Sequence, residues 1–234
     1  MTVTTTRLSQ AAGIATAIGG AIFIAVQVNH PAMEVASATT ASWIIRSTAK
    51  TLMCGLVLAG ITAIYLRQRE KVGILGLAGY LLLSTGYFLM FGTEYLAAFV
   101  LPGAADKAPG WVNDVIVAAF GGQAAGDIGS LGMVFAVTGF CYVLGGLLFG
   151  IASFRAGILA RSAAVLLAVG NVSTLALAVL PGSFNRPMAV PTGVALIGLG
   201  VSLWRDQHRQ AAASVANSPA TTPAVAPRAQ AALR

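Results

Sequence analysis

Apolar residues gather into six long runs along this chain, and most charged residues fall between them. Each run approaches the roughly 20 apolar residues that a membrane-spanning helix needs. Helices are expected because lipid offers no hydrogen-bond partner to backbone N–H and C=O groups. The pattern therefore predicts an all-α, polytopic transmembrane helix bundle. Its six spans are residues 11–28, 43–66, 72–101, 130–154, 162–180 and 188–204.

The amino-acid composition also indicates a protein embedded in a lipid bilayer. The 234 residues are 57% hydrophobic and 9% charged, whereas soluble domains carry roughly 25% charged residues. Alternating segments typical of a transmembrane barrel are not seen. A cleaved signal peptide is the alternative for the first run, because residues 36–38 (ASA) resemble a cleavage site. That site lies well past the apolar run, so we favour a retained first span.

Lysine and arginine fix the expected orientation. With the N-terminus inside, 10 of the 14 basic residues fall on inner segments, as the positive-inside rule requires. Both termini are then cytoplasmic, and the expected localisation is the cell membrane. The net charge of +7 follows from this asymmetry and does not indicate nucleic-acid binding.

Two segments stand apart from the spans. The bundle is expected to occupy residues 1–205, and residues 206–234, rich in Ala, Pro, Ser and Thr, to form a disordered cytoplasmic tail. The outer loop 102–129 contains an apolar stretch, 111–120, that is too short to span and that Gly-Gly would end. We expect a helix there, either on the outer membrane surface or as a cover for the bundle.

Small residues on the fourth span suggest close helix contacts. Gly132, Gly139 and Gly146 recur every seven residues and so share one helix face. We favour packing inside the bundle, with a homodimer through this face as the alternative. Asn171 is the polar group nearest the bilayer centre, and an interhelical hydrogen bond is its favoured role over substrate binding.

The third span carries Tyr80, Tyr87 and Glu94 on one face. Glu94 lies 23 residues past Lys71, about 34 Å along a helix, and so near the outer boundary. Lys50 falls at a similar depth on the second span. The two are either snorkelling side chains or an ion pair lining a pocket open to the outer leaflet.

An outer pocket of this kind suggests acid–base chemistry, because a carboxyl group shielded from water can act as a general acid. The predicted catalytic residues are Glu94, Asp127 and Asp114. The predicted substrate-binding residues are Lys50, Tyr87, Tyr95, Tyr80 and Asn171.

Other chemistry has little support. Cys54 and Cys141 lie at similar depth, so they are either a disulfide or, as we favour, two separate buried thiols. His30 and His208 fall on opposite sides of the membrane and cannot share a metal ion. No metal site, cofactor motif, phosphate loop or nucleophile elbow is predicted.

The layout resembles small, uncharacterised bacterial integral membrane proteins with six spans. The resemblance is carried by the entry RLSQAAG at 7–13, the basic turn 67–71, the turn 154–161 and the last span 191–205. The long acidic outer loop departs from that pattern. The resemblance implies the fold and no particular activity.

Three functions remain open from the sequence. The first is a protein that binds, or acts by acid–base chemistry on, a lipid-soluble, isoprenoid-like molecule in the outer pocket; as an enzyme it would be a cyclase or isomerase. The second is a small transporter or transporter subunit, which the lack of charges at the bilayer centre disfavours. The third is a scaffold or regulatory partner. Membrane lipids are the expected partners in each case.

Overall fold

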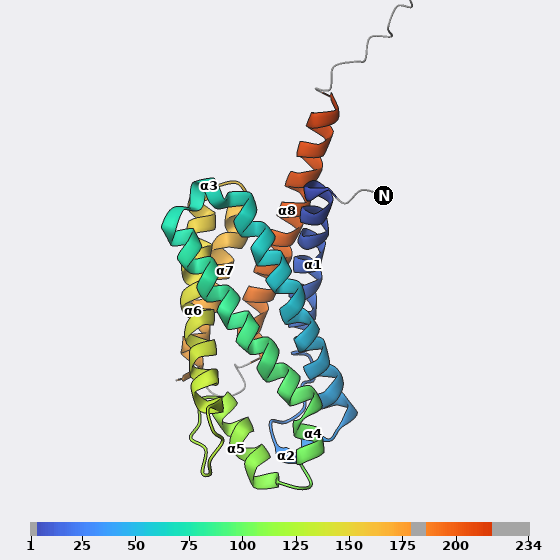
Figure 1. Ribbon diagram of the computed structural model, residues 1–234, viewed down its shortest axis with the longest axis vertical. Coiled ribbons are helices and arrows are strands. Elements are labelled where there is room, and N and C mark those ends of the chain that lie inside the picture. The colour runs from blue at the N-terminus through green and yellow to red at the C-terminus, as the bar shows by residue number, and fades with distance from the viewer. Residues whose placement is uncertain (1–3, 179–185, 217–234) are drawn as a thin grey trace, which may run out of the picture.

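The long apolar runs form long helices. The computed structural model describes residues 4–178 and 186–216, which contain α-helices and 3-10 turns but no strand (Figure 1). The all-α prediction is thus confirmed for these residues. Four helices are long and apolar enough to cross a membrane. They are α1 (Thr5–Ala25), α3 (Ala41–Phe99), α6 (Leu131–Ala156) and α8 (Val190–Ala216).

Shorter elements connect the long helices. The apolar helix α7 (Arg161–Ser173) runs into the 3-10 turn η1 (Thr174–Ala178) and is shorter than the four long helices. The others are α2 (Val35–Ala38), α4 (Leu101–Ala104), α5 (Pro109–Ala119) and the 3-10 turn η3 (Pro187–Ala189). Helix α5 confirms the helix expected in the outer loop, and Gly121, with a φ of 79°, follows its end.

Helix α3 is a hairpin of two antiparallel arms. It breaks at Gly73, whose φ of 57° and ψ of −157° are open to glycine and strained for other residues. The arms meet through Tyr65 and Tyr80, whose stacked rings lie 4.5 Å apart between centroids. Farther from the break, Trp43 Nε1 donates to the Ala97 carbonyl at 2.9 Å. The predicted second and third spans are therefore the two arms of α3.

The connections separate into two ends of the bundle (Figure 1). The break in α3 lies at one end together with the start of α1, the α6–α7 turn and the last turns of α8; we call it the Gly73 end. Helices α2, α4 and α5 lie at the other, the α5 end. The described parts of the predicted inner and outer segments thus occupy opposite ends. Which end faces the cytoplasm stays a prediction.

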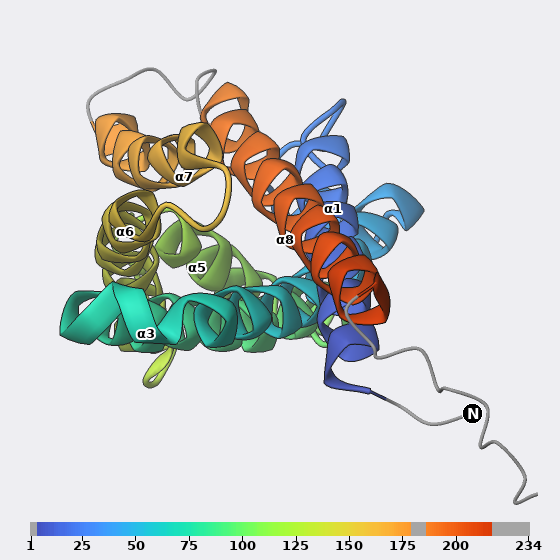
Figure 2. The same cartoon turned by 90° about the horizontal axis from the view of Figure 1, so that it is seen from above.

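Glycines bring the helix backbones together in two places. A Cβ on Gly79 or Gly86 would collide with the backbone of α6, and one on Gly145 with the backbone of α3. Gly13 of α1 and Gly200 of α8 approach each other in the same way. Such close contacts are typical of membrane helices, where dispersion replaces the hydrophobic effect. Figure 2 shows α8 crossing α1 on one side and α6 beside α7 on the other.

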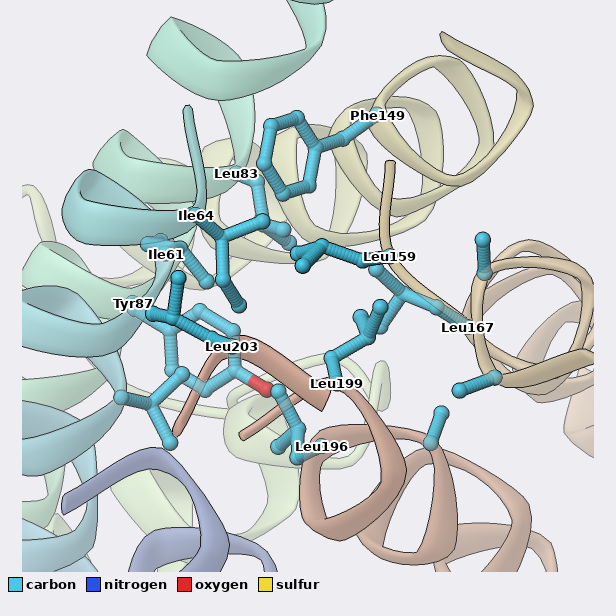
Figure 3. Close-up of a cluster of buried hydrophobic side chains, with 14 of the residues drawn as sticks. Ile61, Ile64, Leu83, Tyr87, Phe149, Leu159, Leu167, Leu196, Leu199 and Leu203 are labelled. Atoms are coloured by element: carbon cyan, nitrogen blue, oxygen red, sulfur yellow. The ribbon is translucent and has the colours of Figure 1, made fainter. Parts of the chain in front are cut away.

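The apolar core lies where α3, α6, α7 and α8 converge (Figure 3). Leu83, Phe149, Leu167 and Leu199 are fully buried there. Near the Gly73 end, Arg67 and Asp206 form a two-pronged salt bridge, with Nε–Oδ2 at 2.6 Å and Nη2–Oδ1 at 3.3 Å. It joins α3 to α8, which continues as a helix past residue 205. The predicted tail beyond residue 216 lies outside the described residues.

Candidate functional site

A cavity of about 580 Å³ opens among the helices at the α5 end. Its wall draws on α1, both arms of α3, α4, α5, α6 and η3. The volume falls within the range of small-molecule sites, about 300–1,000 Å³. Most of the wall is apolar, with Met90, Ile116, Phe120 and Phe135 among its residues.

Helix α5 closes this end of the bundle because one of its faces is apolar. Val112, Val115 and Ile116 are buried, and they pack with Trp43 and Leu101 in a second hydrophobic cluster. Pro109 stands in the first turn of α5, where a missing N–H costs little. The sequence feature that predicted a cover thus produces one, and its inner face becomes part of the cavity wall.

An ion pair lines the cavity. Lys50 Nζ of the first α3 arm lies 3.4 Å from Glu94 Oε1 of the second arm. Their side chains are only 14% and 21% exposed. The depth argument from the sequence placed these residues at the same level, and the hairpin at Gly73 brings them face to face. Of the two predicted alternatives, the paired arrangement is therefore the one observed.

His30 contributes a neutral acceptor to the wall. Its Nδ1 lies 2.9 Å from the Pro31 carbonyl, which can only accept, so Nδ1 carries the hydrogen. Nε2 is buried and has no hydrogen-bond partner among the described residues. Burial, together with the charges of Lys50, Arg186 and Arg46, lowers the pKa of His30 from 6.5 to about 4, and the hydrogen bond to Pro31 acts against this shift. At neutral pH the ring is uncharged.

Arg186 adds a second cation. It precedes η3, is half-buried and lines the cavity. Its Nη1 donates to Gln27 Oε1 at 3.3 Å, which links the start of the last helix to the end of α1. Burial lowers the pKa of the Arg186 guanidinium, and the charge of Glu94 opposes that effect. Among the described residues Arg186 forms no ion pair.

The other two predicted carboxylates hold their own loop. Asp114 is buried on α5 and accepts hydrogen bonds from the backbone N–H groups of Ala125 and Gly126, at 3.0 and 2.9 Å. Asp127 is exposed and accepts from the Gly129 N–H at 2.7 Å. Neither lines the cavity, so Glu94 is the only one of the three that reaches it.

The predicted tyrosines lie outside the cavity wall. The Tyr80 hydroxyl lies 3.2 Å from Thr62 Oγ1 in the hairpin. Tyr87 is fully buried against Tyr142, and its hydroxyl has no partner among the described residues. Tyr95 is 51% exposed and contacts Phe99. The heptad spacing places Tyr80, Tyr87 and Glu94 on one face, but different neighbours cover that face along its length.

Asn171 is the centre of an interhelical hydrogen-bond network. Its Nδ2 donates to the Tyr142 carbonyl at 2.8 Å, and its Oδ1 accepts from Thr192 Oγ1 at 3.3 Å. The Tyr142 hydroxyl donates to Thr192 at 3.2 Å. These bonds tie α6, α7 and α8 together, which is the packing role favoured from the sequence. Tyr142 lines the cavity, and Asn171 stands behind it.

The glycine face of α6 divides into two parts. A Cβ on Gly146 would collide with Asn171 of α7, so this glycine permits close packing. Gly139 lines the cavity, and a Cβ there would meet nothing within 4 Å. A Cβ on Gly132 would meet only Ile128 Cδ1, at 3.9 Å. The homodimer through this face stays a prediction.

Besides several hydroxyl side chains of the wall, the sequence reasoning missed His30, Gln27 and Arg186. Gln27 and His30 follow the C-terminal end of α1, whereas Arg186 directly precedes η3, far away in the chain. The signal available was their position: all three fall in predicted outer segments or at their edges, at the depth of Glu94. Only the packing of α1 against α8 brings them to one site.

The described residues form no disulfide and no cluster of metal ligands. Cys54 and Cys141 are free and buried, as favoured from the sequence. Among the described residues, no three His, Cys, Asp or Glu side chains gather to hold a metal ion. Comparison with known proteins gives no relative to argue from: no protein-family model, curated protein or solved structure matches this chain.

Proposed function

We propose that this protein is an integral membrane protein that binds a lipid-soluble, amphipathic molecule in the cavity at the α5 end. The observation that carries the proposal is the cavity itself, which combines an apolar wall with an ion pair and a half-buried arginine. A ligand with an apolar body and a polar end fits such a wall, because apolar contacts supply affinity and a few polar groups fix orientation. An isoprenoid-like molecule belongs to this class.

Binding is favoured over acid–base catalysis. The sequence suggested three carboxylates for proton transfer, and a cyclase or isomerase needs at least one of them free to exchange a proton with the substrate. Asp114 and Asp127 hold backbone amides of their own loop. Glu94 borders the cavity but is engaged by Lys50 at 3.4 Å. The geometry supports a positioning role for Glu94 in ligand binding.

A matched pair of glycine substitutions on α6 tests the proposal. Gly139→Leu places a side chain in the cavity, where a Cβ meets no atom within 4 Å. Gly132→Leu makes the same change two turns away on the same helix, outside the cavity wall. Small molecules that co-purify with the wild type and with each variant are identified by mass spectrometry. We expect a specific amphiphile in the wild type and in Gly132→Leu and its loss from Gly139→Leu.

The opposite result is equally clear. If all three proteins carry the same bulk lipid in the same amounts, the cavity does not bind a specific molecule and the proposal fails. Glu94→Gln separates binding from chemistry in the same experiment. A binding site carries the same compound in the wild type and in this variant, whereas an enzyme would carry unconverted substrate in the variant alone.

The same proposal includes a topology. We place the Gly73 end in the cytoplasm, with α1, the two arms of α3, α6, α7 and α8 as six crossings. The positive-inside rule supports it, because basic residues concentrate at the Gly73 end. Single cysteines at Arg69 and Lys107, in a chain whose Cys54 and Cys141 are replaced by Ala, test it with a membrane-impermeant maleimide. In intact cells the cysteine at position 107 should react and that at 69 should not; the reverse pattern would invert the topology.

A further inference from the structure

We infer that the ligand of the cavity carries an anionic headgroup, a carboxylate or a phosphate, held by Arg186 with help from Lys50. This inference rests on the proposed function and adds the chemistry of the polar end. It starts from the charges that border the cavity. Two cations, Lys50 and Arg186, face a single carboxylate, Glu94. His30 adds no charge at neutral pH, because its pKa is about 4.

The extra positive charge at the cavity, one cation more than carboxylates, is not balanced by another Asp or Glu side chain. All seven Asp and Glu residues of the chain fall within the described residues. Among these residues the ion pairs are Lys50 with Glu94 and Arg67 with Asp206. Asp114, on α5 beside the cavity, is satisfied by two backbone N–H groups. Thus none of the Asp and Glu side chains, all of them in the part of the chain that the structure describes, forms an ion pair with Arg186.

The guanidinium group of Arg186 has N–H donors, left free by the described residues, that could bind an anion. A guanidinium offers five N–H donors in a planar fork that matches a carboxylate or a phosphate. The bond from Nη1 to Gln27 Oε1 occupies one of these donors. Half-burial of a charge without an ionic partner is unfavourable. An anionic headgroup would relieve that cost, while a neutral one would leave it in place.

The neighbourhood of His30 points the same way. The charges that act on this ring come from Lys50, Arg186 and Arg46, all of them positive. The polar end of the cavity therefore lies in a positive field, and Glu94 is the one carboxylate among the described residues that line the cavity. A monoanion would bring the bordering charges of Lys50, Arg186 and Glu94 to zero in total.

The test compares headgroups on one acyl chain. Oleic acid, oleoyl lysophosphatidic acid and oleyl alcohol are titrated by calorimetry into delipidated protein in a non-ionic detergent. Charge-assisted hydrogen bonds predict that the wild type binds at least one anion about tenfold more tightly than the alcohol. The tighter anion then identifies the source of the headgroup, fatty acid or phospholipid.

Three variants, with a fourth in reserve, test which residue causes the preference for an anion. Arg186→Gln should remove most of the tenfold preference, because it weakens the binding of the anions far more than that of the alcohol. Arg46→Gln removes a charge from the same end but not from the cavity wall, and should keep the preference. Glu94→Gln should act in the opposite direction and tighten anion binding. Arg186→Lys, which keeps the charge but not the fork, replaces Arg186→Gln if that variant does not fold, and should lose part of the preference.

The failures are distinguishable. Equal binding of the alcohol and both anions would overturn the anionic headgroup and leave the proposed function standing. The headgroup inference also fails if Arg46→Gln loses the preference as fully as Arg186→Gln, since general surface charge would then explain it. If no probe binds and Gly139→Leu carries the same lipids as the wild type, the cavity is not a ligand site and both proposals fall.

Discussion

The helices pack closely toward one end of this bundle and enclose a cavity at the other. From the core toward the Gly73 end, glycines let α3 and α6 touch through their backbones, and apolar side chains fill the space between them. At the α5 end the same two helices part, and α5 closes a cavity instead of a core. In the part of the chain that the structure describes, each end has one ion pair: Arg67 with Asp206 at the first, Lys50 with Glu94 at the second.

The difference lies in where the small residues stand. Gly145 on α6 faces the backbone of α3, whereas Gly139, less than two turns away, faces the cavity. A glycine at a helix contact lets two backbones approach closely, whereas a glycine in the cavity wall leaves the cavity larger. The hollow end is therefore a consequence of residues that leave space, and a side chain in that space should change binding before it changes stability.

The largest expected effect is a difference in stability between substitutions at these two glycines. Gly145→Leu would drive a side chain into the α3 backbone, and overpacking of this kind costs about 3 kcal/mol of unfolding free energy. Gly139→Leu should cost nothing or stabilise slightly, because leucine is the better helix former and meets open space. Thermal unfolding of delipidated protein in detergent measures both. Equal destabilisation would mean that the cavity is as tightly closed as the core.

Much of the fold follows from the sequence for a physical reason. A helix in lipid needs a long apolar run, so the long helices, the hairpin of α3 and the short helix α5 could all be predicted from hydropathy and glycine positions. The similar depth of Lys50 and Glu94 could be predicted as well, since the rise of a helix fixes depth along two antiparallel arms, but the sequence left open whether the two side chains pair. These are one-dimensional properties of the chain.

The composition of the site could be predicted only in part. Rotation about a helix axis and the tilt of α5 depend on packing, so the sequence placed Asp114 and Asp127 in the right loop without showing that they turn to backbone amides. It placed Tyr87 on the face of Glu94 without showing that Tyr142 covers it. His30 and Arg186 belong to segments whose proximity depends on contacts between α1 and α8.

A smaller effect, on pH, should arise at the cavity end. The folded-state pKa of His30, about 4, lies below its ordinary value of 6.5, so the unfolded chain binds more protons between these values. Stability therefore falls as pH falls through 6.5 toward 4. Discounted for solvent screening, His30 should account for about 1 kcal/mol of the stability lost between pH 7 and pH 5.

The variant His30→Gln provides the comparison. It keeps a polar side chain of similar size but cannot titrate, so its melting temperature should fall less than that of the wild type between pH 7 and pH 5. The two proteins are followed in the same detergent by circular dichroism. Parallel losses would show that the acid sensitivity arises elsewhere in the chain.

The smallest expected effect compares the two ion pairs themselves. Double-mutant cycles with Arg67→Gln and Asp206→Asn, and with Lys50→Gln and Glu94→Gln, measure the coupling energy of each pair. The first pair is short and two-pronged, and should couple by about 1 kcal/mol; the second is a single contact at 3.4 Å and should couple by about 0.5 kcal/mol. A weakly coupled Lys50 can move toward a ligand anion at little cost, which suits a binding site. A Lys50–Glu94 coupling larger than that of Arg67 and Asp206 would instead make the cavity pair the main brace of the α3 hairpin.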